Sequence, residues 1–265
     1  MTRGFIDTDR AVLRVAGENA RDFLQGLVTN DVRGLDRGAV YAALLSPQGK
    51  YLFDFFLVPD GDDVLVDVKA DRADALAQRL GMYRLRANVT VEPVGVAVAV
   101  GTGAPPPGAL ADPRDPALGW RAYGADPAVL LAGIAPLDPD EREAERVARA
   151  VPETGIELVA DESYILEMGF ERLHGVDFRK GCYVGQEVTA RMKHKTELRK
   201  GLVRVRIDGP PPPPGTEIHA GDRSAGILLS TAGGQGLAYL RFDRADASLM
   251  AGDAVLVWDK ESTLG

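Results

Sequence analysis

The chain has 265 residues, enough for two or three compact parts, and 45% of them are hydrophobic, as in an ordinary globular protein. The formal net charge of −8 argues against general nucleic-acid binding, and no run of eighteen apolar residues indicates a membrane helix. The single cysteine excludes an intrachain disulfide and any metal site with several cysteine ligands. We expect neither a nucleic-acid nor a membrane partner.

Cysteine usage and the first residues also predict a compartment. Residues 1–7 lack the apolar core of a secretory signal peptide. A protein with one thiol and no export signal is typical of a reducing compartment, so we expect a cytoplasmic localisation.

The first hundred residues mix strand and helix patterns. Pro47-Gln48-Gly49 is typical of a hairpin loop, and Asp71 is suited to a helix N-cap. Apolar residues at helical spacing predict helices over 20–28 and 72–80. Short β-rich runs predict strands at 11–15, 39–45, 51–58, 64–68, 87–91 and 94–100. This part is therefore expected to be α+β.

After residue 100 the sequence predicts two helices, followed by a β-rich C-terminal part. The Pro- and Gly-rich segment 101–116 indicates a surface loop, and the charged segment 138–151 indicates a helix with Pro139 in its first turn. Val184, Val188 and Met192 lie four residues apart and predict a helix over 186–196. After a proline-rich connector at 209–215, strands at 218, 225–230, 236–242 and 254–258 indicate a small β-barrel.

These patterns predict three parts. Residues 1–100 form the first α+β part, and residues 101–197 form a second α+β part that ends in the cysteine segment and its helix. Residues 198–265 form the barrel-like part.

The only cysteine lies in the sequence Lys180-Gly181-Cys182-Tyr183-Val184-Gly185-Gln186-Glu187. Nearby cations and a following helix N-terminus favour the thiolate over the thiol, and the thiolate is the reactive and metal-binding form. Free cysteines are, however, often buried and inert. The residues alone leave a nucleophile, a ligand and an inert thiol open, with Lys180 as the group that would keep the thiolate charged.

The cysteine lies in a basic segment of an acidic chain. Between Glu171 and Arg206 the sequence has ten Lys or Arg against four acidic residues. This excess indicates an anionic partner, although a solvated helix face is the common alternative for such a run. Glu187 and Arg191 are four residues apart on the predicted helix, where a pair of opposite charges adds a few tenths of a kcal/mol.

The three histidines give weak signals. His174, His194 and His219 are too few and too scattered to predict a metal site, so none is expected. A catalytic pair of Cys182 with His174 lacks an evident third group that would orient the histidine.

The segment KGCYVGQEVTAR at 180–191 resembles the signature of the YgfZ family, which is related to the glycine-cleavage T-protein. Other segments resemble the family in the same order, so that the resemblance covers nearly the full chain: 23–26, 29–32, 45–54, 152–154, 166–167 and 226–241. It implies an α+β cloverleaf of two α+β parts and a small C-terminal β-barrel around a central channel, with tetrahydrofolate as the ligand.

The resemblance also implies a function. It indicates an accessory factor that assembles or repairs iron–sulfur clusters, chiefly in [4Fe–4S] enzymes, without a permanent metal or cluster of its own. Cys182 and Lys180 match the family's functional positions, while Tyr183, Gly185, Gln186 and Glu187 form the frame of the motif. The expected partners are folate and iron–sulfur assembly proteins or client [4Fe–4S] enzymes.

Two alternatives remain open from the sequence. The first is a folate-dependent aminomethyltransferase, but T-proteins carry an acidic pair where this chain has Phe53-Asp54. Asp54 is still a candidate to contact a pterin. The second is a folate-dependent scaffold that docks on assembly partners and performs no chemistry. The candidate folate residues are Asp54, Tyr183, Gln186, Glu187 and Arg191.

Overall fold

The structure, a computed structural model, describes residues 1–84, 87–195, 197–245 and 248–260. Its contacts group the chain into two compact units. Unit 1 consists of Met1–Asp138 and Leu173–Gln186, and unit 2 consists of Pro139–Arg172 and Glu187–Gly265. The expected division into three parts at 1–100, 101–197 and 198–265 stays a prediction.

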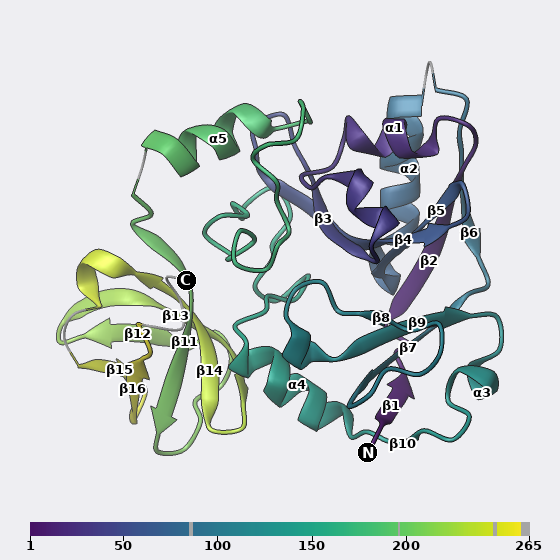
Figure 1. The fold of residues 1–265 in the computed structure, drawn as a ribbon. Coiled ribbons are helices and arrows are strands. Elements are labelled where there is room, and N and C mark those ends of the chain that lie inside the picture. Colours follow the sequence, from purple (N-terminus) through teal and green to yellow (C-terminus); the bar gives the residue numbers. More distant parts are fainter. Residues whose placement is uncertain (85–86, 196, 246–247, 261–265) are drawn as a thin grey trace. The chain divides into compact units, whose positions relative to one another are not determined.

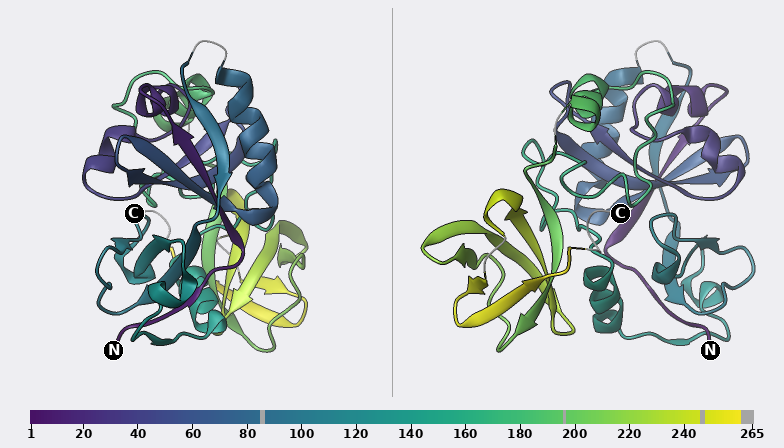
Figure 2. Two further views of the ribbon diagram at one scale, coloured as in Figure 1. Left: turned by 90° about the vertical axis from the view of Figure 1, so that its right-hand side faces the viewer. Right: turned by 60° about the vertical axis from the view of Figure 1, so that its left-hand side comes forward.

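Unit 1 contains an antiparallel sheet in the order β3-β4-β5-β2-β6, whose strands come from the predicted α+β part (Figure 1). Helix α2 lies along this sheet in Figure 2. Every residue from Tyr51 to Val58 is buried, because both faces of the sheet are covered. The elements are β2 (Arg10–Ala16), α1 (Ala20–Gln25), β3 (Val40–Leu45), β4 (Tyr51–Asp60), β5 (Asp63–Lys69), α2 (Ala73–Tyr83) and β6 (Thr90–Val94), with 3-10 turns at Val32–Asp36 and Ala70–Arg72.

The predicted hairpin is present, but the predicted cap of α2 is wrong. Strands β3 and β4 pair antiparallel around 47–49. Residues Ala70–Arg72 form a 3-10 turn, so α2 begins at Ala73 and its N-cap is Arg72 rather than Asp71. The cap is displaced because the preceding turn already occupies the position that the sequence assigned to it.

A second sheet in unit 1 has the order β10-β1-β7-β9-β8. The buried ring of Trp120 fills the space above Gly4 and Gly101, where a Cβ atom would collide with it. The elements are β1 (Arg3–Ile6), β7 (Ala97–Thr102), β8 (Leu110–Ala111), β9 (Trp120–Gly124), α3 (Pro127–Leu130) and β10 (Ala135–Pro136), with a 3-10 turn at Pro116–Leu118. Strands β1, β9 and β10 were not predicted, and β8 lies in the segment 101–116 that the sequence assigned to a surface loop.

A buried ionic cluster joins the two sheets of unit 1. Asp67 of β5 is fully buried and accepts hydrogen bonds from Arg10 Nε at 2.6 Å, Arg121 Nη2 at 2.6 Å and Tyr123 Oη at 2.8 Å. Burial raises the pKa of Asp67, but Arg10 and Arg121 outweigh it, so that the pKa lies below its usual value. The carboxylate is therefore charged and paired inside the unit.

Unit 2 contains a closed antiparallel barrel in the order β11-β14-β13-β12-β15-β16 (Figure 1). Arg146 of α4 is buried and donates to Ser230 Oγ on β13 at 3.0 Å and to Glu157 Oε2 at 3.1 Å, which fixes the helix on the barrel. The elements are α4 (Pro139–Ala148), α5 (Gln186–Lys195), β11 (Lys200–Asp208), β12 (Glu217–Ala220), β13 (Arg223–Ala232), β14 (Gln235–Arg241), β15 (Leu249–Ala251) and β16 (Ala254–Trp258), with a 3-10 turn at Phe242–Arg244.

Between α4 and α5 the chain is irregular. Residues 149–185, all of them described, contain no helix or strand beyond an isolated bridge of Thr154 with Leu158. The segment is nevertheless packed, since Ile165, Phe170 and Leu173 are buried. The signature motif begins in this segment.

Candidate functional site

Cys182 is an exposed, free cysteine on the irregular segment that precedes α5. The helix starts at Gln186, as the sequence predicted, so its N-terminus follows the thiol by four residues. The electrostatic effect of a helix end falls off within the first turn, so a favourable effect of this helix on the thiolate stays a prediction. Its exposure contradicts the interpretation as a buried, inert packing residue. The thiol is accessible to a ligand or a reactant.

The amino group of Lys180 is held by backbone carbonyl groups. The residue is 4% exposed, and Nζ donates to the carbonyl oxygens of Gln25 at 2.7 Å, Val28 at 2.5 Å and Asn30 at 3.1 Å. Burial lowers the pKa of Lys180 to about 8, although Asp31 and Asp177 raise it. An ammonium group has three N–H donors, so these bonds use all of them. The geometry gives Lys180 an anchoring contact, and its predicted action on the thiolate stays a prediction.

The residues after Cys182 fix the loop on the sheet of unit 1. Tyr183 is buried, and the Nζ atom of Lys180 lies 5.2 Å from the centroid of its ring. Val184 packs on the core of the sheet. Gly185 has a φ of +81°, and a Cβ atom there would lie 2.5 Å from the carbonyl oxygen of Ser46. Only glycine fits this close approach without strain.

The predicted binding residues at the start of α5 make a backbone hydrogen bond and an exposed ion pair. The Gln186 N–H donates to the Tyr183 carbonyl oxygen at 3.3 Å. Glu187 and Arg191 form the ion pair expected from their spacing, with 2.7 Å between Arg191 Nη2 and Glu187 Oε1, and both side chains are exposed. A role of Tyr183, Gln186, Glu187 and Arg191 in folate binding stays a prediction.

Asp54 lies on β4 between two tyrosines and is 7% exposed. Tyr41 Oη donates to Oδ2 at 2.9 Å, and Tyr51 Oη donates to Oδ1 at 2.8 Å. Burial, followed by the charge of Asp54, raises the pKa of Tyr41 well above its usual value. The phenol groups are thus fixed as donors to the carboxylate. Whether Asp54 also contacts a pterin stays a prediction.

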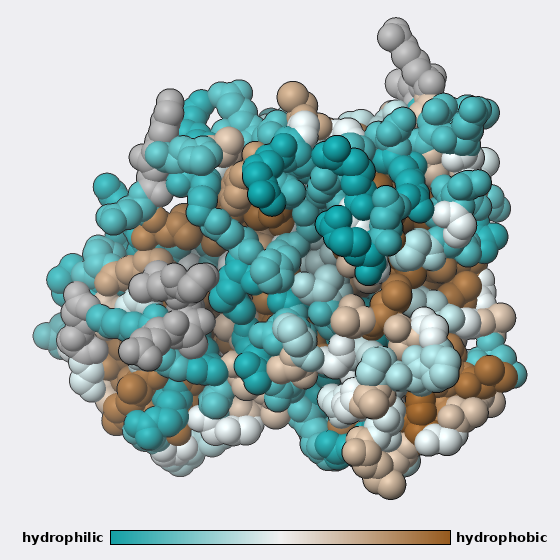
Figure 3. Space-filling model, viewed as in Figure 1, coloured by the Kyte–Doolittle hydropathy of each residue, from teal (hydrophilic) through white to brown (hydrophobic). Residues whose placement is uncertain are grey.

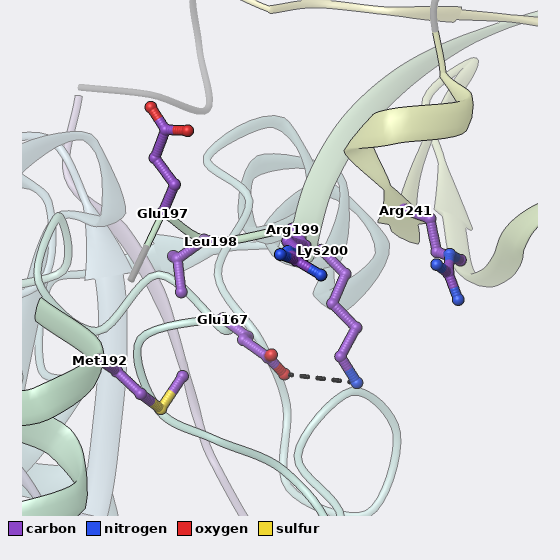
Figure 4. A pocket seen from close by; sticks show the side chains of 7 residues that line it. All are labelled: Glu167, Met192, Glu197, Leu198, Arg199, Lys200 and Arg241. Carbon is purple, nitrogen blue, oxygen red and sulfur yellow. Dashed lines mark ion pairs between the residues drawn. The ribbon is translucent and has the colours of Figure 1, made fainter. Parts of the chain in front are cut away.

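Unit 2 has a cavity of about 270 Å³ at one end of the barrel (Figure 4). Lys200 of β11 and Arg241 of β14 are directly opposite each other in the sheet. Like charges in such a pair repel each other. The lining residues are Glu167, Met192, Glu197, Leu198, Arg199, Lys200 and Arg241.

Glu167 offsets part of this positive charge. It is 9% exposed, accepts a hydrogen bond from Tyr239 Oη, and lies 3.9 Å from Lys200 Nζ, the ion pair drawn in Figure 4. Burial and then the Glu167 carboxylate raise the pKa of Tyr239, which keeps the phenol protonated. The lining combines three cationic side chains with the acidic Glu167 and Glu197 and the apolar Met192 and Leu198, so that cationic groups are in excess by one. Such a lining suits a carboxylate-bearing ligand with an apolar portion.

The sequence patterns did not indicate the residues of unit 1 that bind the chain segment leading to Cys182. Thr29 Oγ1 donates to the Gly175 carbonyl oxygen at 2.7 Å, and Asn30 Nδ2 donates to that of His174 at 2.6 Å. Both residues fall in a segment that resembles the family, but spacing alone gives no indication of contacts across 144 or more residues.

The remaining surface gives few further signals. Within the described ranges, no group of three or more His, Cys, Asp or Glu side chains could hold a metal ion, and no helix is long and apolar enough to cross a membrane. The face drawn in Figure 3 is mainly hydrophilic, with apolar residues in separate patches. Scattered apolar side chains of this kind are ordinary on protein surfaces.

Comparison with solved structures identifies the class of fold. The aminomethyltransferase T of the glycine cleavage system from Bartonella henselae matches 97% of this chain and 84% of its own, with a TM-score of 0.75 and 13% identity. The family model for the CAF17 C-terminal β-barrel domain matches residues 199–264. The protein therefore has an aminomethyltransferase-type α+β fold with a closed C-terminal barrel. This confirms the predicted fold class, whereas the central channel stays a prediction.

Curated relatives identify the family within this class. The mitochondrial iron–sulfur cluster assembly factors IBA57 of Mus musculus and Homo sapiens are each 32% identical to this chain, over 88% and 87% of it and 75% of their own lengths. The IBA57 homolog of Mycosarcoma maydis is 33% identical over 77% of this chain, which spans 57% of that relative. The chain belongs to the IBA57 family of iron–sulfur cluster assembly factors.

The family corrects two expectations. The relatives are named IBA57 rather than YgfZ, so the expected connection with iron–sulfur cluster assembly is confirmed and the narrower family name is not. The relatives are also named mitochondrial, which contradicts the expected cytoplasmic localisation. The expectation was wrong because one cysteine and the lack of a secretory signal do not distinguish among compartments in which thiols stay reduced.

Proposed function

We propose that this protein is an accessory factor for the assembly or repair of iron–sulfur clusters, chiefly those of [4Fe–4S] enzymes, and that Cys182 acts in it as a thiolate. The observation that carries the proposal is an exposed thiol on a loop fixed at Lys180 and Gly185. Membership of the IBA57 family supports the process. The partners would be iron–sulfur assembly proteins or the client enzymes themselves.

One thiolate sets the chemistry that Cys182 can perform. Because the chain has one cysteine and no group of three or more His, Cys, Asp or Glu among the described residues could hold a metal ion, a cluster at Cys182 would take further ligands from a partner or a small thiol. The contact would then be transient, with the cluster as cargo. The anchored loop would present the thiol to the partner in a constant geometry, which reduces the conformational entropy lost on docking.

A reduced folate such as tetrahydrofolate is the second part of the proposal. The cavity of unit 2 supports it, because Arg199, Lys200 and Arg241 could bind the carboxylates of a folate glutamate tail while Met192 and Leu198 contact apolar atoms. Arginine and lysine are the usual partners of ligand carboxylates. When bound, the folate would supply a carrier for one-carbon units.

The thiolate role is tested by complementation. Cells that lack this protein would receive the wild type, Cys182→Ser or Arg179→Met, the last as a control on an exposed neighbour whose side chain is 94% accessible. We expect Cys182→Ser to lose most of the [4Fe–4S] enzyme activity and Arg179→Met to retain it. Full activity with Cys182→Ser would contradict the thiolate role and favour a folate-dependent scaffold.

The folate part is tested by titration of the pure protein with tetrahydrofolate. We expect Cys182→Ala to bind like the wild type and Arg199→Gln with Arg241→Gln to bind about tenfold or more weakly, since each lost charged hydrogen bond costs about 1.5 to 3 kcal/mol. Wild-type protein that binds no folate would refute this part alone. Turnover of an aminomethyl-lipoyl protein would instead favour an aminomethyltransferase.

A further inference from the structure

The edge of strand β3 is covered by residues 28–30 instead of another strand, and Val28 forms an isolated bridge with Leu44 there. The Thr29 N–H donates to the Ala43 carbonyl oxygen at 3.0 Å, and the Ala43 N–H donates to Thr29 Oγ1 at 2.8 Å. Asn30 Nδ2 donates to the Tyr41 carbonyl oxygen at 2.8 Å. Thr29 is fully buried. This pair of residues therefore satisfies backbone groups that an edge strand would otherwise expose.

The same two side chains also bind the segment that leads to Cys182. Thr29 Oγ1 donates to the Gly175 carbonyl oxygen at 2.7 Å, Asn30 Nδ2 donates to that of His174 at 2.6 Å, and the Asp177 N–H donates to the Thr29 carbonyl oxygen at 3.1 Å. A hydroxyl has one proton and an amide nitrogen has two. Each side chain thus bonds to the sheet edge on one side and to the loop on the other.

His174 has a φ of +53°, a conformation that costs a residue other than glycine of the order of 1 kcal/mol or more. Its carbonyl oxygen is the acceptor of the Asn30 bond. The surrounding contacts must hold such a residue in place, and the Asn30 amide is one of them. Further along the loop, Lys180 Nζ donates a hydrogen bond to the Asn30 carbonyl oxygen at 3.1 Å.

From these contacts we infer that Thr29 and Asn30 are positioning residues for Cys182, acting through the loop 173–185 without contacting the thiol. The inference rests on the proposed role of Cys182. The two residues connect the rigid sheet of unit 1 to the loop at 174–177, and Lys180 and Gly185 fix it on either side of the thiol. Sites held by rigid elements present their reacting groups more accurately than free loops do.

Four variants of the whole chain test this inference. Thr29→Val keeps the shape of the side chain and removes the hydroxyl, whereas Thr29→Ser retains the hydroxyl and removes the methyl group. Asn30→Asp keeps the shape and replaces both amide protons with an acceptor. Val66→Ala, in the fully buried core of β5, is the control for a general loss of stability.

The first measurement is amide hydrogen exchange in 173–185. We expect Thr29→Val and Asn30→Asp to exchange there about tenfold or more faster than the wild type, because an unpaired buried group makes local opening easier. Thr29→Ser and Val66→Ala should keep the protection of this loop relative to the rest of the sheet. Equal protection in all five proteins would overturn the inference.

The second measurement is [4Fe–4S] enzyme activity in cells that lack this protein. We expect loss of most activity with Thr29→Val, rescue with Thr29→Ser and retention with Val66→Ala. A Thr29→Val protein that is fully active despite fast exchange in the loop would also overturn the positioning role. Failure of the proposed function gives a different pattern, in which Cys182→Ser is fully active while loop exchange still depends on Thr29.

Discussion

At the scale of single residues, the ammonium group of Lys180 shows how a charge can organise a loop. It is buried beneath the motif, and its three donors bind three carbonyl oxygens at the end of α1 and in the following turn. Carbonyl groups near a helix C-terminus have no partner within the helix, and a lysine is well suited to bind them. The side chain therefore connects the cysteine loop to α1.

Replacing Lys180 tests this anchoring role. Lys180→Met keeps the length of the side chain but leaves buried carbonyl oxygens unpaired, so we expect a loss of about 2 to 4 kcal/mol in the free energy of unfolding. Arg179→Met, at an exposed neighbour, should change stability by less than about 0.5 kcal/mol. Urea denaturation measures both, and equal stabilities of the two variants would contradict the anchoring role.

At the scale of elements, closure of the barrel depends on a close approach between β13 and β14. Gly226 faces Leu240, and a Cβ atom on Gly226 would overlap the Tyr239 carbonyl oxygen. Gly81 of α2 is the opposite case, since a Cβ atom there would meet no atom within 4 Å other than the neighbouring backbone of its own helix. The same glycine-to-alanine change therefore has opposite consequences in the two elements.

Thermal or urea unfolding of two variants measures this difference. Gly226→Ala should destabilise the protein by about 1 to 3 kcal/mol, because the strands must separate to accommodate the methyl group. Gly81→Ala should stabilise it by about 0.5 to 1 kcal/mol, since alanine loses less conformational freedom in a helix. A stabilising Gly226→Ala would show that the barrel is closed differently from the structure.

At the scale of the whole molecule, the ionic cluster around Asp67 joins two separate sheets of unit 1. Its partners Arg10 and Arg121 come from β2 and β9, far apart in the sequence. Removing one member leaves the others charged and buried, which costs more than the pair itself contributes.

Asp67→Asn should therefore lower the free energy of unfolding by about 3 to 5 kcal/mol at neutral pH. The folded-state pKa of Asp67 is lowered from its ordinary 3.8, so this stabilisation is fully present above that value and is lost as the pH falls through the folded-state pKa. Urea titrations between pH 7 and acid conditions should show the gap between wild type and variant closing. Asp62→Asn, in an exposed turn, is the control, and a gap of the same size at every pH would contradict the assignment.

Local patterns were sufficient for much of the fold. Alternation and β-branched residues predicted β2, β3, β4, β5 and most of the barrel. Helical spacing predicted α1, α2 and α5, and the charged segment with Pro139 in its first turn predicted α4. Strand β11 was missed although Leu202, Val203 and Val205 are buried, because its lysine and arginine residues were interpreted as part of a basic segment. Counting the charges along this segment obscured the alternation of buried and exposed residues that indicates a strand.

In the candidate site, too, the sequence indicated the local features but not the long-range contacts. The single cysteine between two glycines is visible in the sequence, and so is the Glu187–Arg191 pair, since both depend on neighbours within four residues. The contacts of Lys180 with Val28 and of Thr29 with Gly175 span about 150 residues, and no period or motif relates such positions. Only folding brings them together.

The sequence by itself therefore determined the α+β class, the barrel at the end of the chain and the identity of the thiol, because propensity, hydrophobic period and residue type are local properties. The tertiary structure decided that Cys182 is exposed, that Lys180 binds carbonyl oxygens, and that Thr29 and Asn30 connect the sheet edge to the cysteine loop. These features depend on which buried polar groups become neighbours, and the requirement that each finds a partner is met only in the packed molecule.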